Sequence, residues 1–173
     1  MIKKLLKLWL VLLSLALLYM AGTIFVEENL AKYTVYYAQR MPHAKDKHPL
    51  PFLVLEELYF LEKPKDIGYS YDTYESPIIY SDKEYLQRFS DSIVYRSKNN
   101  NTYDFSSTNH KFTGIGTENG IFTEPSEKEF QSVNVDAVWR DIDSFLEPFV
   151  ERQPKPKVNL QWLFNWRYEK RFN

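Results

Sequence analysis

The sequence predicts an α+β protein that consists of a small soluble head on a single N-terminal transmembrane helix. Residues 8–26 form an unbroken run without a charged residue, as a membrane-spanning helix requires. The remainder mixes helical hydrophobic spacing, clearest in residues 135–151, with short strand-like segments around a turn in residues 111–124. The mean hydropathy is −0.46 despite the apolar run, so the rest of the chain is polar and we expect no second membrane span.

The composition of the 173 residues excludes several classes of protein. Cysteine is absent, which excludes disulfide-stapled scaffolds, zinc ribbons and iron–sulfur sites. The 22 basic and 23 acidic residues leave a formal charge of −1, whereas a nucleic-acid partner calls for a basic excess. Aromatic residues make up 17% of the chain, far more than a disordered protein carries. A folded domain without a nucleic-acid partner is therefore expected.

Residues 8–26 are the predicted transmembrane anchor. At about 1.5 Å rise per residue they span roughly 28 Å, close to the hydrocarbon thickness of a bilayer. The alternative is a secretory signal that is cleaved after residue 23, with Ala21 and Thr23 as the small residues before the cut. Because Ile24 and Phe25 continue the apolar run past that cut, we favour an uncleaved anchor.

The charges on either side of the anchor predict its orientation. Three lysines precede it and two glutamates, Glu27 and Glu28, follow it, so residues 1–7 form a cytoplasmic tail by the positive-inside rule. The 147 residues after the anchor then lie outside the cytoplasm, with 19 basic and 23 acidic residues, a formal charge of −4. The opening Met-Ile-Lys-Lys is bacterial in style. We therefore expect a single-pass protein of the inner (plasma) membrane whose C-terminal part is periplasmic.

Residues 27–51 are predicted to form a helical stalk and linker, and residues 52–173 the extracytoplasmic α+β domain. Leu30, Tyr33 and Tyr37 recur at helical spacing, so the membrane helix should continue, or nearly continue, to Met41. Three prolines in residues 42–51 then end the helix.

The first half of the predicted domain contains two helices. Leucine and glutamate dominate residues 52–61, which favours a helix over a buried strand, whereas residues 62–80 have the irregular composition of a loop. Ser81 and Glu84 match a capping box, which predicts a helix that ends before residues 98–101.

The second half contains predicted strands and one long helix. Strands are expected at residues 102–105, 111–117 and 120–124, the last two joined by a turn at Asn119-Gly120. A second capping box at Ser126 and Glu129 precedes an amphipathic helix over residues 135–151. In residues 158–168 every second residue is apolar or aromatic, which predicts a terminal strand with one buried face.

Candidate catalytic and metal-binding residues are few. His43, Asp46 and His48 lie in a proline-rich segment whose spacing matches no ligand motif, so we interpret them as a solvated loop and predict no metal site and no cofactor. Glu56 and Glu57 interrupt an apolar run, and general acid catalysis requires one such carboxyl to be desolvated. No nucleophile motif accompanies them, so no catalytic residue is assigned.

Aromatic residues are the candidate binding residues. Tyr69, Tyr71 and Tyr74 lie in a polar, turn-rich segment, where rigid amphipathic rings suit protein or sugar recognition. Trp162 and Trp166 lie in a cationic tail that is suited to a membrane interface. The structural alternative for the tyrosines is that they fill a core that has no cysteine. The structural alternative for the tryptophans is that the tail is a terminal strand that docks on the head.

The favoured hypothesis is a membrane-anchored extracytoplasmic protein that acts by binding another protein. It would be an accessory component of an envelope machine, or an immunity or inhibitor protein. Its other partner is the lipid bilayer, through residues 8–26. One alternative is a membrane-anchored envelope hydrolase that uses Glu56 or Glu57, and another is a structural protein that rests on the membrane through its tail. The first hypothesis is favoured because the sequence contains no catalytic signature.

Overall fold

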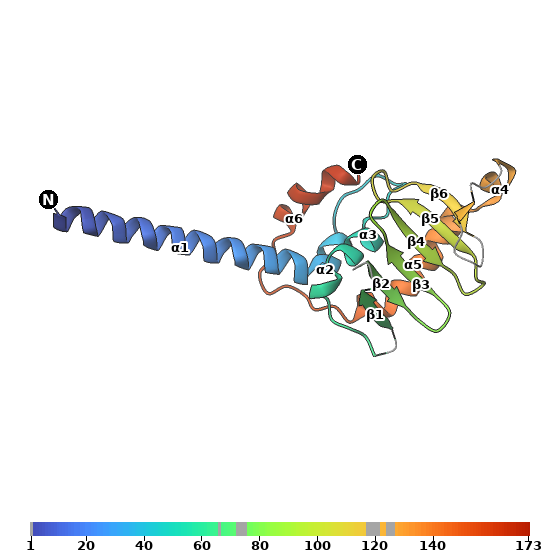
Figure 1. The fold of residues 1–173 in the computed structure, drawn as a ribbon, viewed down its shortest axis with the longest axis horizontal. Helices are drawn as coiled ribbons and strands as arrows, with labels where there is room; N and C mark the ends of the chain where they lie inside the picture. Colours follow the sequence, from blue (N-terminus) through green and yellow to red (C-terminus); the bar gives the residue numbers. More distant parts are fainter. Residues whose placement is uncertain (1, 66, 72–75, 117–121, 124–126) are drawn as a thin grey trace.

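The computed structural model describes residues 2–65, 67–71, 76–116, 122–123 and 127–173. A long N-terminal helix, α1 (Ile2–Lys32), extends away from a head in which helices pack on an antiparallel sheet (Figure 1). Side chains from Leu6 to Phe25 on α1 are exposed, and the helix is long and apolar enough to cross a membrane. The predicted α+β class, with an apolar N-terminal helix and a small head, agrees with this architecture.

The segment after the apolar run packs into the head. Helix α1 ends at Lys32 and, after a break at Tyr33, a short helix α2 (Thr34–Ala38) follows. Six side chains that we expected to belong to a stalk are buried in the hydrophobic core of the head: Leu30, Ala31, Val35, Tyr37, Ala38 and Met41. The helical course predicted for residues 27–41 is thus nearly continuous, and its apolar stripe faces the head rather than solvent.

Within the described residues the sheet has seven strands in chain order, each antiparallel to the next. They are β1 (Gly68–Tyr71), β2 (Pro77–Tyr80), β3 (Tyr85–Arg88), β4 (Ser92–Arg96), β5 (Thr102–Ser106), β6 (Phe112–Gly116) and β7 (Phe122–Thr123). Strands β5 to β7 confirm the strands predicted from the sequence. The Asn119-Gly120 turn between β6 and β7 lies outside the described residues, as does Ser126.

Two predictions for residues 62–97 are wrong. The segment expected to be irregular forms β1 and β2, and the helix expected after Ser81 is replaced by β3 and β4. The Ser81 hydroxyl does accept a hydrogen bond from the Glu84 backbone N–H, at 3.2 Å, but this bond closes a turn. The Glu84 carboxylate does not return to the turn; it accepts from the Tyr95 hydroxyl at 2.7 Å. Pairing with β4 therefore decides the conformation of β3.

Helices α3 (Pro49–Glu56) and α5 (Val135–Glu151) pack against one face of the sheet (Figure 1). Helix α5 confirms the helix predicted over residues 135–151, and it begins at an Asn134 cap whose side chain accepts from the Ala137 N–H. The helix predicted over residues 52–61 is confirmed in part, because α3 begins earlier, at Pro49 in the predicted linker, where proline suits the first turn of a helix. The Trp139 ring of α5 lies 4.1 Å from the Phe105 ring of β5, centroid to centroid. A short 3₁₀ helix, η1 (Leu58–Phe60), extends α3, and a short α4 (Glu127–Ser132) precedes α5.

The C-terminal tail is helical, so the predicted strand over residues 158–168 is wrong. Helix α6 (Gln161–Tyr168) is followed by a 3₁₀ turn, η2 (Glu169–Arg171). Phe164 and Tyr168 are buried, whereas Trp162 and Trp166 are exposed; a strand would have placed all four on one face. Contact of the Phe164 ring with the Tyr37 ring, 5.2 Å between centroids, holds the helix on the core.

Candidate functional site at the base of the head

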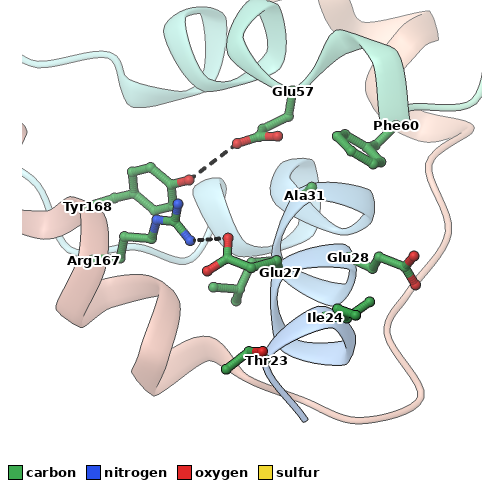
Figure 2. A pocket seen from close by; sticks show the side chains of 10 residues that line it. Thr23, Ile24, Glu27, Glu28, Ala31, Glu57, Phe60, Arg167 and Tyr168 are labelled. Carbon is green, nitrogen blue, oxygen red and sulfur yellow. Dashed lines mark hydrogen bonds and ion pairs between the residues drawn. The ribbon is translucent and has the colours of Figure 1, made fainter. Parts of the chain in front are cut away.

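A mixed polar and apolar hollow at the base of the head lies between α1, η1 and α6, and has a volume of about 430 Å³. Figure 2 shows its walls: Ile24, Glu27 and Ala31 on α1, Glu57 and Phe60 around η1, and Arg167 and Tyr168 on α6. Segments from both ends of the chain and from its first third meet here. This cleft is the candidate functional site.

Glu57 and Tyr168 are titratable groups of the cleft whose pKa values are raised by their surroundings. Glu57 caps the end of α3, next to buried Leu58, and its carboxylate accepts a hydrogen bond from the Tyr168 hydroxyl at 3.3 Å. Burial raises the pKa of the Glu57 carboxyl above its usual range, and the bond from Tyr168 opposes this only in part. Burial and the Glu57 carboxylate also raise the pKa of the Tyr168 phenol to about 12.

The rim of the cleft is closed by an ion pair between Arg167 of α6 and Glu27 of α1 (Figure 2). Both side chains are more than one-third exposed, so solvent screening leaves the pair little net stabilising energy. Its hydrogen bond to Glu27 raises the pKa of the Arg167 guanidinium. The importance of the pair is positional, because it joins the C-terminal helix to the first charged residue after the apolar run.

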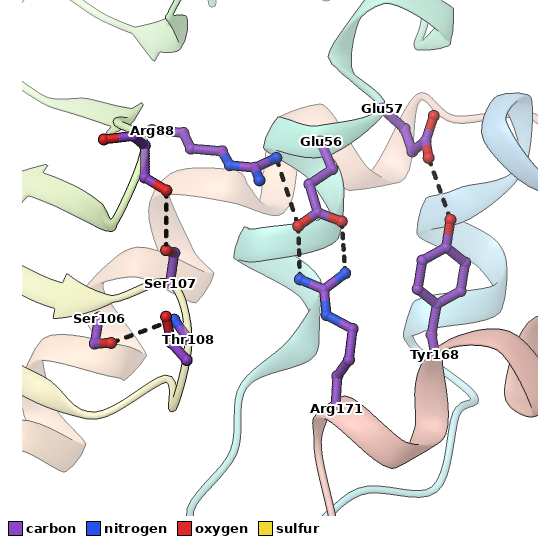
Figure 3. Close-up of polar contacts among 9 residues, drawn as sticks. Glu56, Glu57, Arg88, Ser106, Ser107, Thr108, Tyr168 and Arg171 are labelled. Atoms are coloured by element: carbon purple, nitrogen blue, oxygen red, sulfur yellow. Dashed lines mark hydrogen bonds and ion pairs between the residues drawn. The ribbon is translucent and has the colours of Figure 1, made fainter.

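Glu56, the neighbour of Glu57, has a different environment. Its two carboxylate oxygens accept hydrogen bonds from the two terminal nitrogens (Nη1 and Nη2) of Arg171, at 2.8 and 2.6 Å, and the Arg88 Nη1 of β3 lies 3.4 Å from the carboxylate (Figure 3). The bond to Glu56 raises the pKa of Arg171. Bidentate pairing of this kind is geometrically specific. Glu56 therefore joins α3, the sheet and the C-terminal turn, and of the two candidate acids only Glu57 faces the cleft.

The cleft combines a desolvated carboxyl with an apolar wall, and its acidic groups Glu27, Glu28 and Glu57 outnumber the single cation Arg167 among the residues that line it. Such a surface can bind a cationic or neutral amphipathic group. Burial raises the pKa of Glu57 above its usual range, as is common for carboxyls that act as general acids.

The histidine loop does not converge on a metal site. The His48 ring stacks on the Trp139 ring at 4.3 Å between centroids, and burial lowers the pKa of His48. His43 is exposed. In the parts of the chain that the structure describes, no three His, Asp or Glu side chains are grouped closely enough to hold a metal ion.

The aromatic residues proposed from the sequence lie on two different elements. Tyr69 is half-buried on the edge strand β1, where the Lys63 ammonium lies 4.7 Å from its ring centroid. Tyr71 is on the same strand with its side chain outside the description, and Tyr74 lies outside the described residues. Trp162 and Trp166 are 69% and 75% exposed on α6, the helix that carries Arg167 and Tyr168 of the cleft.

Sequence reasoning missed the residues that assemble the cleft. Tyr168 and Arg167 were interpreted as parts of a strand, and Phe60 as part of an ordinary apolar run. One pattern in the sequence could have indicated the helix. Phe164 and Tyr168 are four residues apart, a spacing that places both side chains on one face of a helix. Comparisons of the chain with protein-family models, with curated protein sequences and with solved structures find no match.

Proposed function

We propose that this is a single-pass membrane protein that holds a protein-binding head at the outer surface of the inner membrane. In this proposal residues 1–7 are cytoplasmic, residues 8–26 span the bilayer, and the head lies outside the cytoplasm. The exposed apolar side chains of α1 support the span, and the three lysines before it support the orientation. The partner is another envelope protein, and the role is that of an assembly accessory or of an immunity or inhibitor protein.

The observation that carries this proposal is the rigid connection between α1 and the head. Leu30 is 2% exposed in the core, only four residues after Val26. The buried Tyr37 hydroxyl donates to the Asn29 side chain at 2.6 Å and accepts from the Leu160 N–H at 3.1 Å, which joins α1 to the C-terminal segment. A flexible linker would let the head search a wide volume. A head of fixed height and orientation instead suits docking to a partner in the same membrane.

The edge strand β1 is the proposed docking surface for the partner. Among the described residues β1 pairs with one strand, β2, and is the first strand of the sheet, which supports its other side as the edge to which an extended segment would add. The Lys63 ammonium donates to the Tyr69 carbonyl at 3.4 Å, which places this carbonyl on the outer side. A lysine at the edge of a sheet also disfavours nonspecific pairing of that edge with strands of other molecules.

Topology is tested by single-cysteine labelling, which is clean because the chain has no cysteine. Ser90 is exposed in the head and Lys4 is exposed in the tail. An impermeant maleimide should label Ser90→Cys in intact cells or spheroplasts, and Lys4→Cys only after permeabilisation. The reverse pattern contradicts the orientation, and release of the protein by alkaline extraction contradicts the anchor.

Partner binding is tested by placing a photo-crosslinking amino acid at Tyr69 or, as a matched control, at Phe130, which is 40% exposed on α4. We expect a discrete crosslinked species from position 69 that is absent from position 130. The same species from both positions, or none from position 69, rules out β1 as the docking surface.

A second candidate function is that of an envelope hydrolase with Glu57 as the general acid. The raised pKa of Glu57 in a cleft at the base of the head favours this candidate. Peptidoglycan or lipid hydrolysis by the detergent-purified protein should then disappear in Glu57→Gln and persist in Glu62→Gln. Absence of any activity from the wild type, or equal activity in both variants, eliminates it.

A further inference from the structure

Exposed aromatic and apolar side chains gather on the side of the head that faces the apolar helix. Outside α1, eight large hydrophobic side chains are exposed among the described residues. Five of them lie on segments that touch the end of α1: Tyr59, Phe60, Val158, Trp162 and Trp166. The other three are scattered over β2, the β3–β4 turn and α4.

These side chains surround α1 on more than one face. Phe60 and Ile24 line the cleft on one face of the helix. Val158 lines a second hollow with Phe25 and Lys32, on a face about 100° further around the helix. The Val158 carbonyl also accepts from the Asn29 side chain at 3.3 Å. In Figure 1 the coil that leads into α6 and the start of α6 lie beside the last part of α1.

The height of this surface follows from the length of α1. Trp9 is 69% exposed near the lysine end, and Glu27 is 18 residues further along, or about 27 Å at 1.5 Å per residue. A span of this length matches the hydrocarbon core, so Glu27 lies at the outer boundary of the bilayer. Because Arg167 pairs with Glu27, the adjoining Trp166 lies at the same boundary.

Helix α6 presents the tryptophans on the face opposite its core contacts. Phe164 is fully buried and Tyr168 is 7% exposed, whereas Trp162 and Trp166, also four residues apart, are 69% and 75% exposed. Indole rings prefer the headgroup region, where the ring is partly dehydrated and its N–H finds a polar partner.

We propose that Trp162 and Trp166, with Tyr59, Phe60 and Val158, seat the base of the head in the interfacial region of the bilayer that α1 spans. This inference rests on the proposed membrane span and adds a second membrane contact to it. A lipid surface is favoured over a protein partner because Phe60, Val158 and the Arg167 that adjoins Trp166 meet different faces of the same short stretch of α1, just after the apolar run, as a surface crossed by the helix requires. At this level Arg167 pairs with Glu27, and Lys32 and Lys157 line the second hollow with Glu28, so the charges are mixed and a zwitterionic lipid surface is sufficient for the contact.

Tryptophan fluorescence of the full-length protein in phosphatidylcholine vesicles tests the proposal. Trp9→Phe removes the indole inside the predicted span and leaves Trp162, Trp166 and the core Trp139, which is 4% exposed. Lipid brominated near the carbonyl end of its acyl chains should quench this variant and shift the remaining emission. The matched control, with Trp162→Phe and Trp166→Phe added, should lose most of that quenching.

A third variant separates failure of this inference from failure of the anchor. Leu15 is 57% exposed in the middle of the span, and Leu15→Trp in the control background, in vesicles of lipid brominated near the methyl end of its acyl chains, reports whether α1 is in the bilayer. Quenching at Leu15→Trp without quenching of Trp162 and Trp166 overturns the interfacial seat and leaves the anchor intact. Absence of quenching at both overturns both proposals. If bromine does not quench Trp162 and Trp166 but their emission shifts with the protein-to-lipid ratio, the surface contacts a second copy of the chain instead of lipid.

Discussion

Protonation of His110 should destabilise the head in mildly acidic solution. The imidazole is 2% exposed, and its ring stacks on Phe172 at 4.3 Å and meets the Phe52 ring at 4.5 Å, centroid to centroid. Neither ring nitrogen has a hydrogen-bond partner among the described residues. Burial lowers the pKa of His110 to about 4, with the cations of Arg171 and Lys47 adding to the shift and Glu56 opposing it.

The size of the effect follows from the two pKa values. Between the ordinary value of 6.5 and about 4 the unfolded chain binds a proton that the folded chain does not. The free energy of unfolding therefore falls as the pH is lowered through this window, by about 3 kcal/mol in total at 1.36 kcal/mol per unit. Below about pH 4 both states are protonated and this contribution to the pH dependence ends.

The assay is urea unfolding of the full-length protein in detergent micelles, followed by near-ultraviolet circular dichroism from neutral pH to about pH 4. His110→Phe keeps a ring between Phe52 and Phe172 and removes the titration, so its loss of stability over the window should be about 3 kcal/mol smaller than that of the wild type. Exposed His43→Phe is the control and should behave as the wild type does. Other titratable groups, His48 included, also contribute to the pH dependence of the free energy of unfolding. These groups are present in the wild type and in both variants, so their contributions cancel in the comparison. Equal pH slopes in wild type and His110→Phe would refute the desolvation argument.

Three further predictions concern the stability of the head, each measured by urea unfolding in micelles. Phe164→Ala should cost about 3–5 kcal/mol and Trp162→Ala less than about 0.5, because only Phe164 is buried; similar costs would contradict the helical tail. Tyr37→Phe should cost about 1–3 kcal/mol, since the buried Asn29 side chain and the Leu160 N–H lose a partner. Trp139→Ala should cost about 3–5 kcal/mol, and a cost below 1 kcal/mol would show that the core does not depend on this ring.

The long helical elements were predicted correctly from the sequence. Residues 8–26 are apolar over a length that fits a helix across a bilayer, and residues 135–151 repeat a hydrophobic pattern over several turns, so local composition and spacing are sufficient to identify both. Short segments were not. The hydrogen bond expected at Ser81 exists, but one capped turn is compatible with a helix and with a tight connection between strands, and the partner strand β4 makes the choice.

In the candidate site, too, the residue types were predicted from the sequence, whereas their arrangement depends on contacts between distant segments. Trp162 and Trp166 were recognised as candidate binding residues by their type, but a strand placed Phe164 and Tyr168 on their side, and only packing against Tyr37 separates the two pairs. The environment of Glu57 depends on Tyr168, which is 111 residues away in the sequence. No local pattern contains such a contact, so its consequences for the pKa of Glu57 are not readable from the sequence.

Composition and patterning alone were enough to indicate an apolar N-terminal helix, a cysteine-free α+β head and a split between a basic tail and an acidic head, because these properties depend on residue type and local spacing. The tertiary structure decided that the apolar side chains on one face of residues 30–41 are core, that the tail is a helix, and that Glu27, Glu57, Arg167 and Tyr168 meet beside the end of α1. These features depend on which distant segments of the chain pack together and exclude water from one another. When a segment is only a few residues long, burial against another segment outweighs its local preference for helix or strand.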